Sequence, residues 1–292
     1  MTLALIAGRG DLPGRVRAEA EGAVVVCALE DQPPTSVTPD LTFRLETLGS
    51  LLLELGQRGV TEVCFAGGID RPQIDPARLD AETAPLVPLL QEALGQGDDG
   101  ALRVVIDLFE RTGFTVRGAH EIAPGIVAEP GTPTKAQPRD THRADADTGA
   151  RVLTEMGAAD EGQACVIRKG VVLAREDARG TDAMLRDLAL AMPDRPEMFK
   201  GDRLTPRGRI WLEDMHEHVD DAAGFGAVLF KGPKPGQDRR ADLPTVGVET
   251  AILCAQAGFD GIVVAAGETI LLDPARVVAV LDAAGMFLWV RG

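Results

Sequence analysis

The sequence contains no tyrosine, only 4% of its 292 residues are aromatic, and positive charge is scarce. Lysine and arginine total 30 against 45 aspartates and glutamates, which gives a formal net charge of −15. Few aromatic rings leave little surface for stacking on bases, and a strong negative charge repels polyanions. These shortages argue against a protein that binds nucleic acid or adheres tightly to an anionic membrane surface.

Cysteine is also scarce, and long hydrophobic runs are absent. The cysteines lie far apart, none in a C-x-x-C pair, and each stands in or beside an apolar run: Cys27, Cys64, Cys165 and Cys254. This pattern indicates buried free thiols in a reducing compartment rather than disulfides or a zinc site. The N-terminal apolar run, about six residues with no basic residue before it, is neither a signal peptide nor a spanning helix. We expect a cytoplasmic protein that is attached to a membrane at most peripherally.

The first part of the chain alternates short buried strands with helices. Continuous apolar runs predict strands at 2–7, 23–29 and 61–68. Apolar residues at helical spacing predict a helix after Pro13 and further helices at 48–59, 85–95 and 99–113. This alternation predicts a parallel sheet covered by helices, which is a Rossmann-like arrangement. Ligands of such sheets bind at the carboxyl ends of the strands, where the glycine turns of this sequence lie.

A proline-rich stretch separates this pattern from a second one. Residues 128–143 contain three prolines and little apolar sequence, and strands and helices resume near Asp145. A chain of this length favours two domains of about 150 residues each. We predict an N-terminal domain over residues 1–130, a linker over 131–143 and a C-terminal α/β domain over 144–292, with the ligand site between the two domains.

Two glycine turns follow predicted strands of the N-terminal domain. Gly8-Arg9-Gly10-Asp11-Leu12-Pro13-Gly14 opens a helix, where backbone N–H groups favour a phosphate. Pro13 stands in place of the third glycine of a dinucleotide fingerprint, and only Glu30 offers an acid for a ribose, so a purely structural turn fits equally well. The second turn contains Gly67, Gly68 and Arg71. Arg71 is a candidate for binding an anion, and an ordinary βα turn is the alternative.

Several other polar motifs allow both a structural and a functional interpretation. Asp145-x-Asp147 has the spacing of a cation site, but helix capping is favoured, and Thr181 or Asp182 of GTDAML would cap a helix and face a ligand. Residues 192–222 carry mixed charge and few periodic apolar positions, which indicates an insertion or mobile loop. His216-x-His218 within it resembles a pair of metal ligands, and a solvated loop is the favoured interpretation.

The segment KGPKPGQDRRADLPTVG at 231–247 concentrates cations in an acidic protein. It follows a predicted strand, and its prolines predict a loop that runs until a helix begins near Thr245. The loop carries four cations around two acids: Lys231, Lys234, Arg239 and Arg240 around Asp238 and Asp242. The bases suit phosphate oxygens, and the carboxylates suit a hard cation or an oriented water. This combination is what cleavage of a pyrophosphate requires.

Seven motifs stand in a fixed order along the chain: G-x-G-x-L-P, CFAGGIDRP, GDDGALR, GAHE, the GQ of DEGQACVIRKGVVLARE, GTDAML and KPGQDRRADLPTVG. Together they resemble the LpxI-type UDP-2,3-diacylglucosamine pyrophosphatases of lipid A biosynthesis over nearly the whole chain. The resemblance implies two α/β domains with the acylated UDP-sugar between them. It implies cleavage to UMP and 2,3-diacylglucosamine 1-phosphate, by attack on the sugar-side phosphorus, with a divalent cation, Mg²⁺ or Mn²⁺. It further implies a homodimer that contacts the inner-membrane surface transiently.

The resemblance also implies roles for particular residues. Asp242 of R-x-D-x-P matches the essential acid, and Asp238, Lys234 and Arg240 share its motif as further catalytic residues, with Asp242 and Asp238 as metal ligands. Matching positions that line the substrate chamber are Leu12, Pro13, Gly67, Gly68, Gln163, Thr181, Asp182 and Gln237. The turns and the cationic segment add Gly10, Arg71, Lys231 and Thr245 as substrate-binding candidates.

Two other functions stay open at this point. A nicotinamide-dependent oxidoreductase would use the first glycine turn, although Pro13 and the missing ribose acid argue against it. A non-catalytic module that binds nucleotide sugars would keep the same residues and leave its ligand intact.

Overall fold

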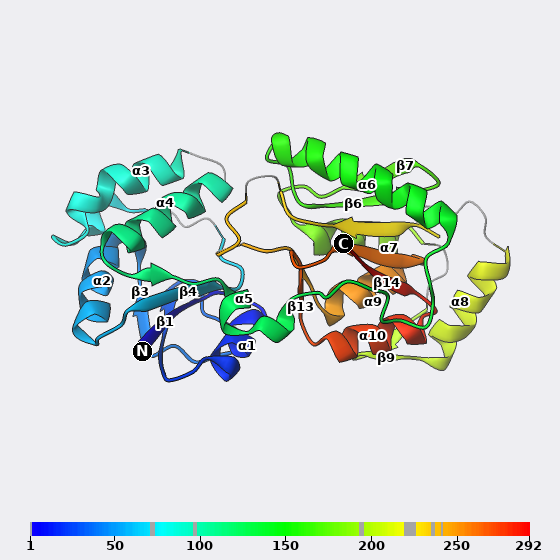
Figure 1. The fold of residues 1–292 in the computed structure, drawn as a ribbon, viewed down its shortest axis with the longest axis horizontal. Coiled ribbons are helices and arrows are strands. Elements are labelled where there is room, and N and C mark those ends of the chain that lie inside the picture. Colours follow the sequence, from blue (N-terminus) through cyan, green and yellow to red (C-terminus); the bar gives the residue numbers. More distant parts are fainter. Residues whose placement is uncertain are drawn as a thin grey trace. The chain divides into compact units, whose positions relative to one another are not determined.

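A computed structural model describes most of the chain, which divides into two compact units (Figure 1). The described residues are 2–70, 74–95, 98–192, 196–218, 226–234, 237–240 and 242–292, and the side chains of 93–94, 98–99 and 215–218 lie outside this description. Unit 1 consists of Met1–Gly125 together with Asp238–Asp242, and unit 2 consists of Ile126–Gln237 and Leu243–Gly292. Each unit has its own sheet and helices, so the predicted α/β class with two domains is confirmed.

The sheet of unit 1 has five parallel strands in the order β3-β2-β1-β4-β5. The strands are β1 (Thr2–Ala7), β2 (Ala23–Leu29), β3 (Leu41–Phe43), β4 (Glu62–Ala66) and β5 (Thr115–Val116). The strand order reverses beside β1, so β1 and β4 are neighbours, and the helices that follow them pack on opposite faces of the sheet. Sheets of this kind bind ligands at that switch point, outside the carboxyl ends of the strands.

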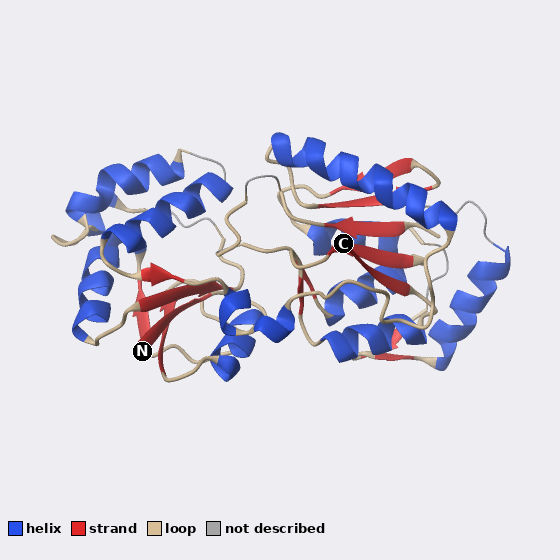
Figure 2. Cartoon of the chain, in the orientation of Figure 1, coloured by secondary structure: helices blue, strands red, loops and turns tan. Residues whose placement is uncertain are grey.

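Helices cover both faces of this sheet (Figure 2). They are α1 (Leu12–Glu19), α2 (Leu48–Gln57), α3 (Val87–Leu94), α4 (Asp98–Arg111) and α5 (Ala119–Ile122), with single 3₁₀ turns at Leu45–Thr47, Pro76–Arg78, Ala84–Leu86 and Pro124–Ile126. Side chains of α2 and α4, such as Leu55 and Phe109, pack on the face that carries Ala4 and Ile6 of β1. Alternate residues of a strand point to opposite faces, so Leu5 serves the other face, where α1 packs on β1 and β4.

The sheet of unit 2 is mixed, in the order β14-β12-β10-β6-β7. Its strands are β6 (Ala164–Arg168), β7 (Val171–Arg175), β10 (Val228–Lys231), β12 (Gly261–Ala265) and β14 (Phe287–Arg291). The strands β10, β12 and β14 run parallel, whereas β6 is antiparallel to β10 and forms a hairpin with β7. This orientation brings the start of β6 and the end of β7 to the same edge as the carboxyl end of β10.

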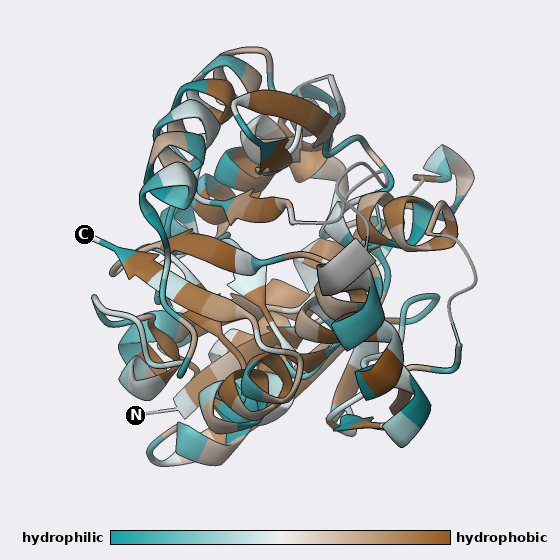
Figure 3. Cartoon of the chain, turned by 90° about the vertical axis from the view of Figure 1, so that its right-hand side faces the viewer, coloured by the Kyte–Doolittle hydropathy of each residue, from teal (hydrophilic) through white to brown (hydrophobic). Residues whose placement is uncertain are grey.

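Unit 2 is also layered, with its long helix on one face and the other helices on the opposite face. Its helices are α6 (Asp140–Ala158), α7 (Thr181–Leu190), α8 (Pro206–His218), α9 (Val248–Gln256) and α10 (Pro274–Ala283). The inner side of α6 packs on Ile167, Phe230 and Val263, and the opposite face packs against α7, α9 and α10. In Figure 3 the strands are mostly brown, as buried apolar strands require. A short parallel pair, β11 (Thr245–Val246) and β13 (Ile270–Leu271), completes this part.

The predicted linker lies within unit 2. Gly131 forms an antiparallel bridge with Val290, and the buried hydroxyl of Thr134 accepts a hydrogen bond from the Leu288 N–H at 2.9 Å. Helix α6 then begins at Asp140, earlier than the sequence pattern indicates. The stretch therefore lies along the outer edge of β14, where it covers backbone groups of an edge strand.

The segment 192–222 has more regular structure than the sequence predicts. It contains an antiparallel hairpin, β8 (Phe199–Lys200) with β9 (Arg203–Leu204), followed by α8. Trp211 and Leu212 of α8 are buried in the same core as Met198. Interpretation as an irregular loop is wrong for 199–218, because these few apolar residues are too widely spaced to show periodicity. In the described part of the chain, no helix combines the length and hydrophobicity needed to cross a membrane.

The four cysteines are free and buried, as the sequence predicts. Burial raises the pKa of Cys27, Cys64 and Cys165 to about 12, and it raises the pKa of Cys254 as well. Thiolates are the reactive form, so fewer than one thiol per chain should react with a disulfide reagent in the native protein at about pH 8. All four should react after denaturation, and fast labelling of the native protein would contradict this arrangement.

Helix α2 carries two glycines in opposite surroundings, which allows a matched test of its packing. A Cβ atom on Gly49 would lie 2.2 Å from the backbone oxygen of Glu82, whereas a Cβ atom on Gly56 would meet nothing within 4 Å. We expect Gly49→Ala to destabilise the protein by about 1–3 kcal/mol through overpacking. Gly56→Ala should stabilise it by about 0.5–1 kcal/mol, since alanine favours the helix. Thermal unfolding curves of both variants test this, and shifts of the same sign would disprove it.

Candidate functional site

The two glycine turns of unit 1 lie side by side at the carboxyl ends of β1 and β4. The Gly8 N–H donates to the Ala66 oxygen at 2.8 Å, and Arg9 and Gly68 exchange both backbone hydrogen bonds at 2.9 Å. A Cβ atom on Gly8 would lie 2.5 Å from the Gly68 oxygen, and Gly67 has a φ of +94°. Glycine is therefore required here because the two backbones touch and one residue is left-handed.

Hydroxyl groups of the loop after β2 engage further amides of the first turn. The Gly10 N–H donates to Thr35 Oγ1 at 2.9 Å, and the Gly14 N–H donates to Ser36 Oγ at 3.1 Å. The Ser36 hydroxyl in turn donates to the Gly10 oxygen at 2.7 Å. An amide that is already hydrogen-bonded within the protein does not offer its proton to a phosphate, so these groups serve the fold of the turn.

Arg9, Gln32 and Asp70 join three loops at this edge of the sheet. Arg9 Nη2 lies 2.6 Å from Asp70 Oδ1, and this hydrogen bond lowers the pKa of the Asp70 carboxyl. The Gln32 side chain binds both backbone groups of Asp70, accepting from the N–H at 2.6 Å and donating to the oxygen at 2.9 Å. The loop is thus fixed as far as Asp70, and the predicted anion ligand Arg71 lies outside the described residues.

The cationic segment is shared between the two units. Lys231 and the residues up to Gln237 belong to unit 2, whereas Asp238–Asp242 belongs to unit 1. The chain returns to unit 2 at Leu243, forms β11, and only then begins α9 at Val248, later than the sequence indicates. Each unit therefore holds two of the four cations, which the sequence alone presents as one loop.

A buried polar network in unit 2 starts at Lys231, which is 7% exposed. Lys231 Nζ donates to Thr181 Oγ1 at 2.9 Å, and the Thr181 hydroxyl donates to Glu176 Oε1 at 2.8 Å. Glu176 Oε2 accepts from the Gln163 N–H at 2.7 Å. The network connects the carboxyl ends of β10 and β7 with the first residue of α7 and the residue before β6.

Gln163 extends this network toward the second lysine. Gln163 Oε1 lies 3.5 Å from Gln237 Nε2, and its backbone oxygen accepts from the Gly232 N–H at 3.2 Å. Gln237 Oε1 accepts from the Lys234 N–H at 3.0 Å, and Lys234 Nζ lies 2.8 Å from Asp160 Oδ1. Both lysines of the segment are therefore held in place by neighbours from unit 2.

Arg240 in unit 1 is held by two carboxylates. Its Nε and Nη2 donate to the two oxygens of Asp238 at 3.0 and 2.7 Å, and its Nη1 donates to Glu110 Oε1 at 2.6 Å. The hydrogen bonds from Arg240 lower the pKa of the Asp238 carboxyl. The guanidinium is thus fixed on three nitrogens and its charge is compensated locally, so the segment is less positive than its sequence indicates.

Asp242 and Asp238 differ in their capacity to hold a cation. The Asp242 N–H donates to the Asp238 oxygen at 3.1 Å, which fixes the turn between them. Both carboxylate oxygens of Asp238 accept from Arg240, and Asp242 is half-buried. Carboxylates are among the ligands that Mg²⁺ prefers. Within the described residues, no three His, Cys, Asp or Glu side chains form a metal-binding group. The residues therefore fit a cation site that substrate phosphates complete, because Mg²⁺ often takes only one or two protein carboxylates.

His120 lies close to the same turn. A Cβ atom on Gly118 would lie 2.4 Å from His120 Cε1 and 3.3 Å from Arg240 Cα, so the three residues crowd together. Burial lowers the pKa of His120, and its ring is therefore uncharged near neutral pH. His120 Nδ1 is buried and has no hydrogen-bond partner among the described residues.

The other predicted substrate residues are divided between the two units. Gly10 is exposed, Leu12 is half-buried and Pro13 is buried at the start of α1. Asp182, beside Thr181, lies 3.8 Å from Arg186, and Thr245 Oγ1 donates to the Leu243 oxygen at 3.2 Å.

Two further motifs have the spacing of metal ligands in the sequence, Asp145-x-Asp147 and His216-x-His218. Asp145 accepts from the N–H groups of Lys169 and Gly170, and Asp147 Oδ1 lies 2.5 Å from Arg291 Nη2. Both acids thus bind donors of their own unit from within α6, so Asp145 stabilises the β6–β7 turn rather than a helix end. The side chains of His216 and His218 lie outside the described residues.

Three acids that support the cations are missing from the sequence-based prediction: Glu176, Glu110 and Asp160. Glu176 directly follows β7 and stands five residues before Thr181, so an acid between a strand end and a helix start was an available signal. Glu110 is one of several acids on α4 and stands 130 positions from Arg240, so nothing local marks it.

Comparison with known proteins identifies the family of the chain. The family models for the LpxI N-terminal domain and the LpxI C-terminal domain match residues 2–126 and 129–289. The UDP-2,3-diacylglucosamine pyrophosphatase LpxI of Caulobacter vibrioides is 36% identical over 291 residues, covering 98% of this chain and 96% of the relative. Because the two models match almost the whole chain and the relative aligns from end to end, the chain belongs to the LpxI family.

Proposed function

We propose that this protein hydrolyses the pyrophosphate bond of UDP-2,3-diacylglucosamine to UMP and 2,3-diacylglucosamine 1-phosphate in lipid A biosynthesis. The observation that carries the proposal is the end-to-end similarity to a UDP-2,3-diacylglucosamine pyrophosphatase, 36% identical over 291 residues. The α/β fold alone would not support it, because such sheets host many activities. The fixed cations and carboxylates of the segment 231–247 supply the chemistry that the reaction needs.

Hydrolysis of a pyrophosphate requires a water nucleophile and groups that stabilise spread negative charge. In the proposed step, water attacks the sugar-side phosphorus, the bond to the bridging oxygen breaks, UMP leaves with that oxygen, and the water proton passes to solvent. Lys231, Lys234 and Arg240 stabilise the phosphate charge. Each is already held by neighbouring side chains, so little reorganisation accompanies the reaction.

We assign the divalent cation to Asp242. Mg²⁺, or Mn²⁺, when bound, would neutralise phosphate oxygens. Asp238 instead orients Arg240, because that guanidinium occupies both of its carboxylate oxygens. The two acids of the segment therefore have different roles: Asp242 binds the cation, and Asp238 orients Arg240, which faces the phosphates.

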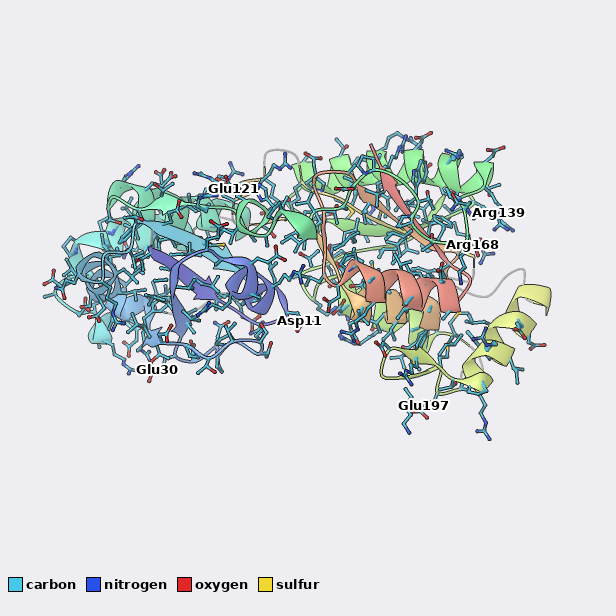
Figure 4. All side chains as sticks on the ribbon, turned by 60° about the horizontal axis from the view of Figure 1, so that its bottom comes forward. Asp11, Glu30, Glu121, Arg139, Arg168 and Glu197 are labelled. Carbon is cyan, nitrogen blue, oxygen red and sulfur yellow. The ribbon has the colours of Figure 1, made fainter. Side chains whose placement is uncertain are left out.

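Substrate contacts in unit 1 are proposed for the exposed surface of the glycine turns rather than for their amides. Gly10, Gly67 and Gly68 expose that surface at the switch point of the sheet, whereas Leu12 is half-buried and Pro13 is buried at the start of α1. An oxidoreductase gains no support, since several amides of the first turn are engaged and Glu30 Oε2 lies 3.6 Å from Arg44 Nη1. Asp11, at the end of the loop after β1, and Glu30, the first residue after β2, are labelled in Figure 4.

We further propose that the protein acts as a homodimer in the cytoplasm and contacts the inner-membrane surface transiently. A formal net charge of −15 disfavours lasting adsorption to anionic lipid, while the acyl chains of the substrate require access to the membrane.

Incubation of the purified protein with UDP-2,3-diacylglucosamine and Mg²⁺ should release UMP, and EDTA should abolish the release. Asp242→Ala should lower kcat/KM by a factor on the order of 10²–10³, because it removes electrostatic stabilisation of the reacting phosphates. Asp140→Ala is a matched control, since the Asp140 carboxylate is fully exposed at the start of α6. Intact substrate with the wild-type protein would indicate a binding module, and full turnover by Asp242→Ala would remove that residue from the mechanism.

The dependence of the rate on Mg²⁺ should separate Asp242 from Asp238. In Asp242→Asn the Mg²⁺ concentration for half-maximal rate should rise by about tenfold or more, because a carboxylate ligand is lost. In Asp238→Asn it should stay within about twofold while kcat falls, because only the hold on Arg240 is weakened. Titration of initial rates with Mg²⁺ measures both values, and equal shifts in the two variants would show that both acids bind the cation.

A further inference from the structure

Glu176 is the centre of the buried network in unit 2. It is 9% exposed, and its two carboxylate oxygens bind different parts of the chain. Oε1 accepts from the side chain of Thr181 at 2.8 Å, at the first residue of α7. Oε2 accepts from the backbone of Gln163 at 2.7 Å, just before β6. One carboxylate therefore fixes the start of a helix and the start of a strand against each other.

The direction of the hydrogen bonds follows from the donors present. A lysine ammonium can only donate, so Thr181 Oγ1 accepts from Lys231 Nζ. The hydroxyl has one proton, and that proton then goes to Glu176 Oε1. The chain of donors runs from a buried cation through one hydroxyl to a buried anion. Neither charge is buried alone, which low-dielectric surroundings would strongly disfavour.

The backbone around Glu176 leaves its side chain little room to move. Gly162 has a φ of +36°, and a Cβ atom there would lie 2.7 Å from Glu176 Cβ. The glycine therefore packs directly on the stem of the glutamate. The next residue, Gln163, takes the hydrogen bond from Gly232 and contacts Gln237. A change at Glu176 would consequently reach several residues that we assign to substrate binding.

We propose that Glu176 is a positioning residue for the substrate diphosphate, acting through Thr181 and Lys231 without touching the substrate. This inference rests on the proposed function. Without the carboxylate, the Thr181 proton loses its acceptor, and Lys231 loses the anion that it reaches through the Thr181 hydroxyl. Both groups would then leave the arrangement in which they meet the phosphates, and small displacements of positioned groups cost large factors in rate.

Asp145 provides a matched control for the loss of a buried carboxylate. It is 4% exposed, and its oxygens accept from the N–H groups of Lys169 and Gly170 at 2.9 and 2.6 Å. This turn joins β6 to β7 at the end of β6 remote from Gln163, where Figure 4 labels Arg168. Asp145→Asn therefore removes a comparable charge beside the same sheet and leaves the Glu176 network intact.

A double-mutant cycle tests the proposal with UDP-2,3-diacylglucosamine as substrate. Glu176→Gln and Thr181→Val should each lower kcat/KM by about tenfold or more. If Glu176 acts through Thr181, the kcat/KM of the double variant should lie within about twofold of the kcat/KM of the less active single variant. Asp145→Asn should lower the thermal midpoint yet keep kcat/KM within about twofold of the wild type.

Several outcomes would overturn the proposal: losses that multiply in the double variant, wild-type kcat/KM in Glu176→Gln, or an equal loss in Asp145→Asn. If Glu176→Gln does not fold, Glu176→Asp takes its place in the cycle, since a shorter carboxylate cannot reach both partners. Non-additive losses with Thr181→Val then support the role, and multiplying losses reject it. A wild-type protein that releases no UMP would overturn the proposed function, and the positioning role with it.

Discussion

Lys231 is a cation in a place that excludes water, and the need to compensate its charge shapes the polar end of unit 2. An isolated charge in such surroundings costs several kcal/mol, so a counter-charge has to be close. Glu176 supplies it through the Thr181 hydroxyl. The same carboxylate binds the backbone before β6, so the solution to one electrostatic problem also fixes the edge of the sheet.

The same rule applies to two other bases of the cationic segment. Lys234 is paired with Asp160, and Arg240 is held by Asp238 and Glu110. A protein with a formal net charge of −15 can surround each base with acids from its own unit. Bases held in this way keep fixed positions, although the neighbouring acids modestly reduce the positive potential around them. Fixed charges suit a reaction whose transition state spreads negative charge over phosphate oxygens.

The glycine turns of unit 1 illustrate how a motif can serve the fold. Glycines 8 and 67 are required because two backbones cross in contact, and hydroxyls of the next loop engage the amides that a phosphate would use. The turns therefore build a rigid edge at the switch point of the sheet. Their glycine pattern alone would have been consistent with a dinucleotide site.

Local patterns determined most strands and helices, the division into two α/β halves and the buried thiols, because apolar periodicity reports burial residue by residue. The sequence also identified Asp242 and the bases of the segment as candidate site residues, since they lie close together in the chain. It placed residues 199–218 in a loop, because their buried residues are too few to show a period. Only the tertiary structure decided the partners: it links Lys231 to Glu176 through Thr181, pairs Arg240 with Glu110 and divides one loop between two units. The physical reason is that charge compensation depends on distance in space, which a linear sequence of acids and bases does not specify.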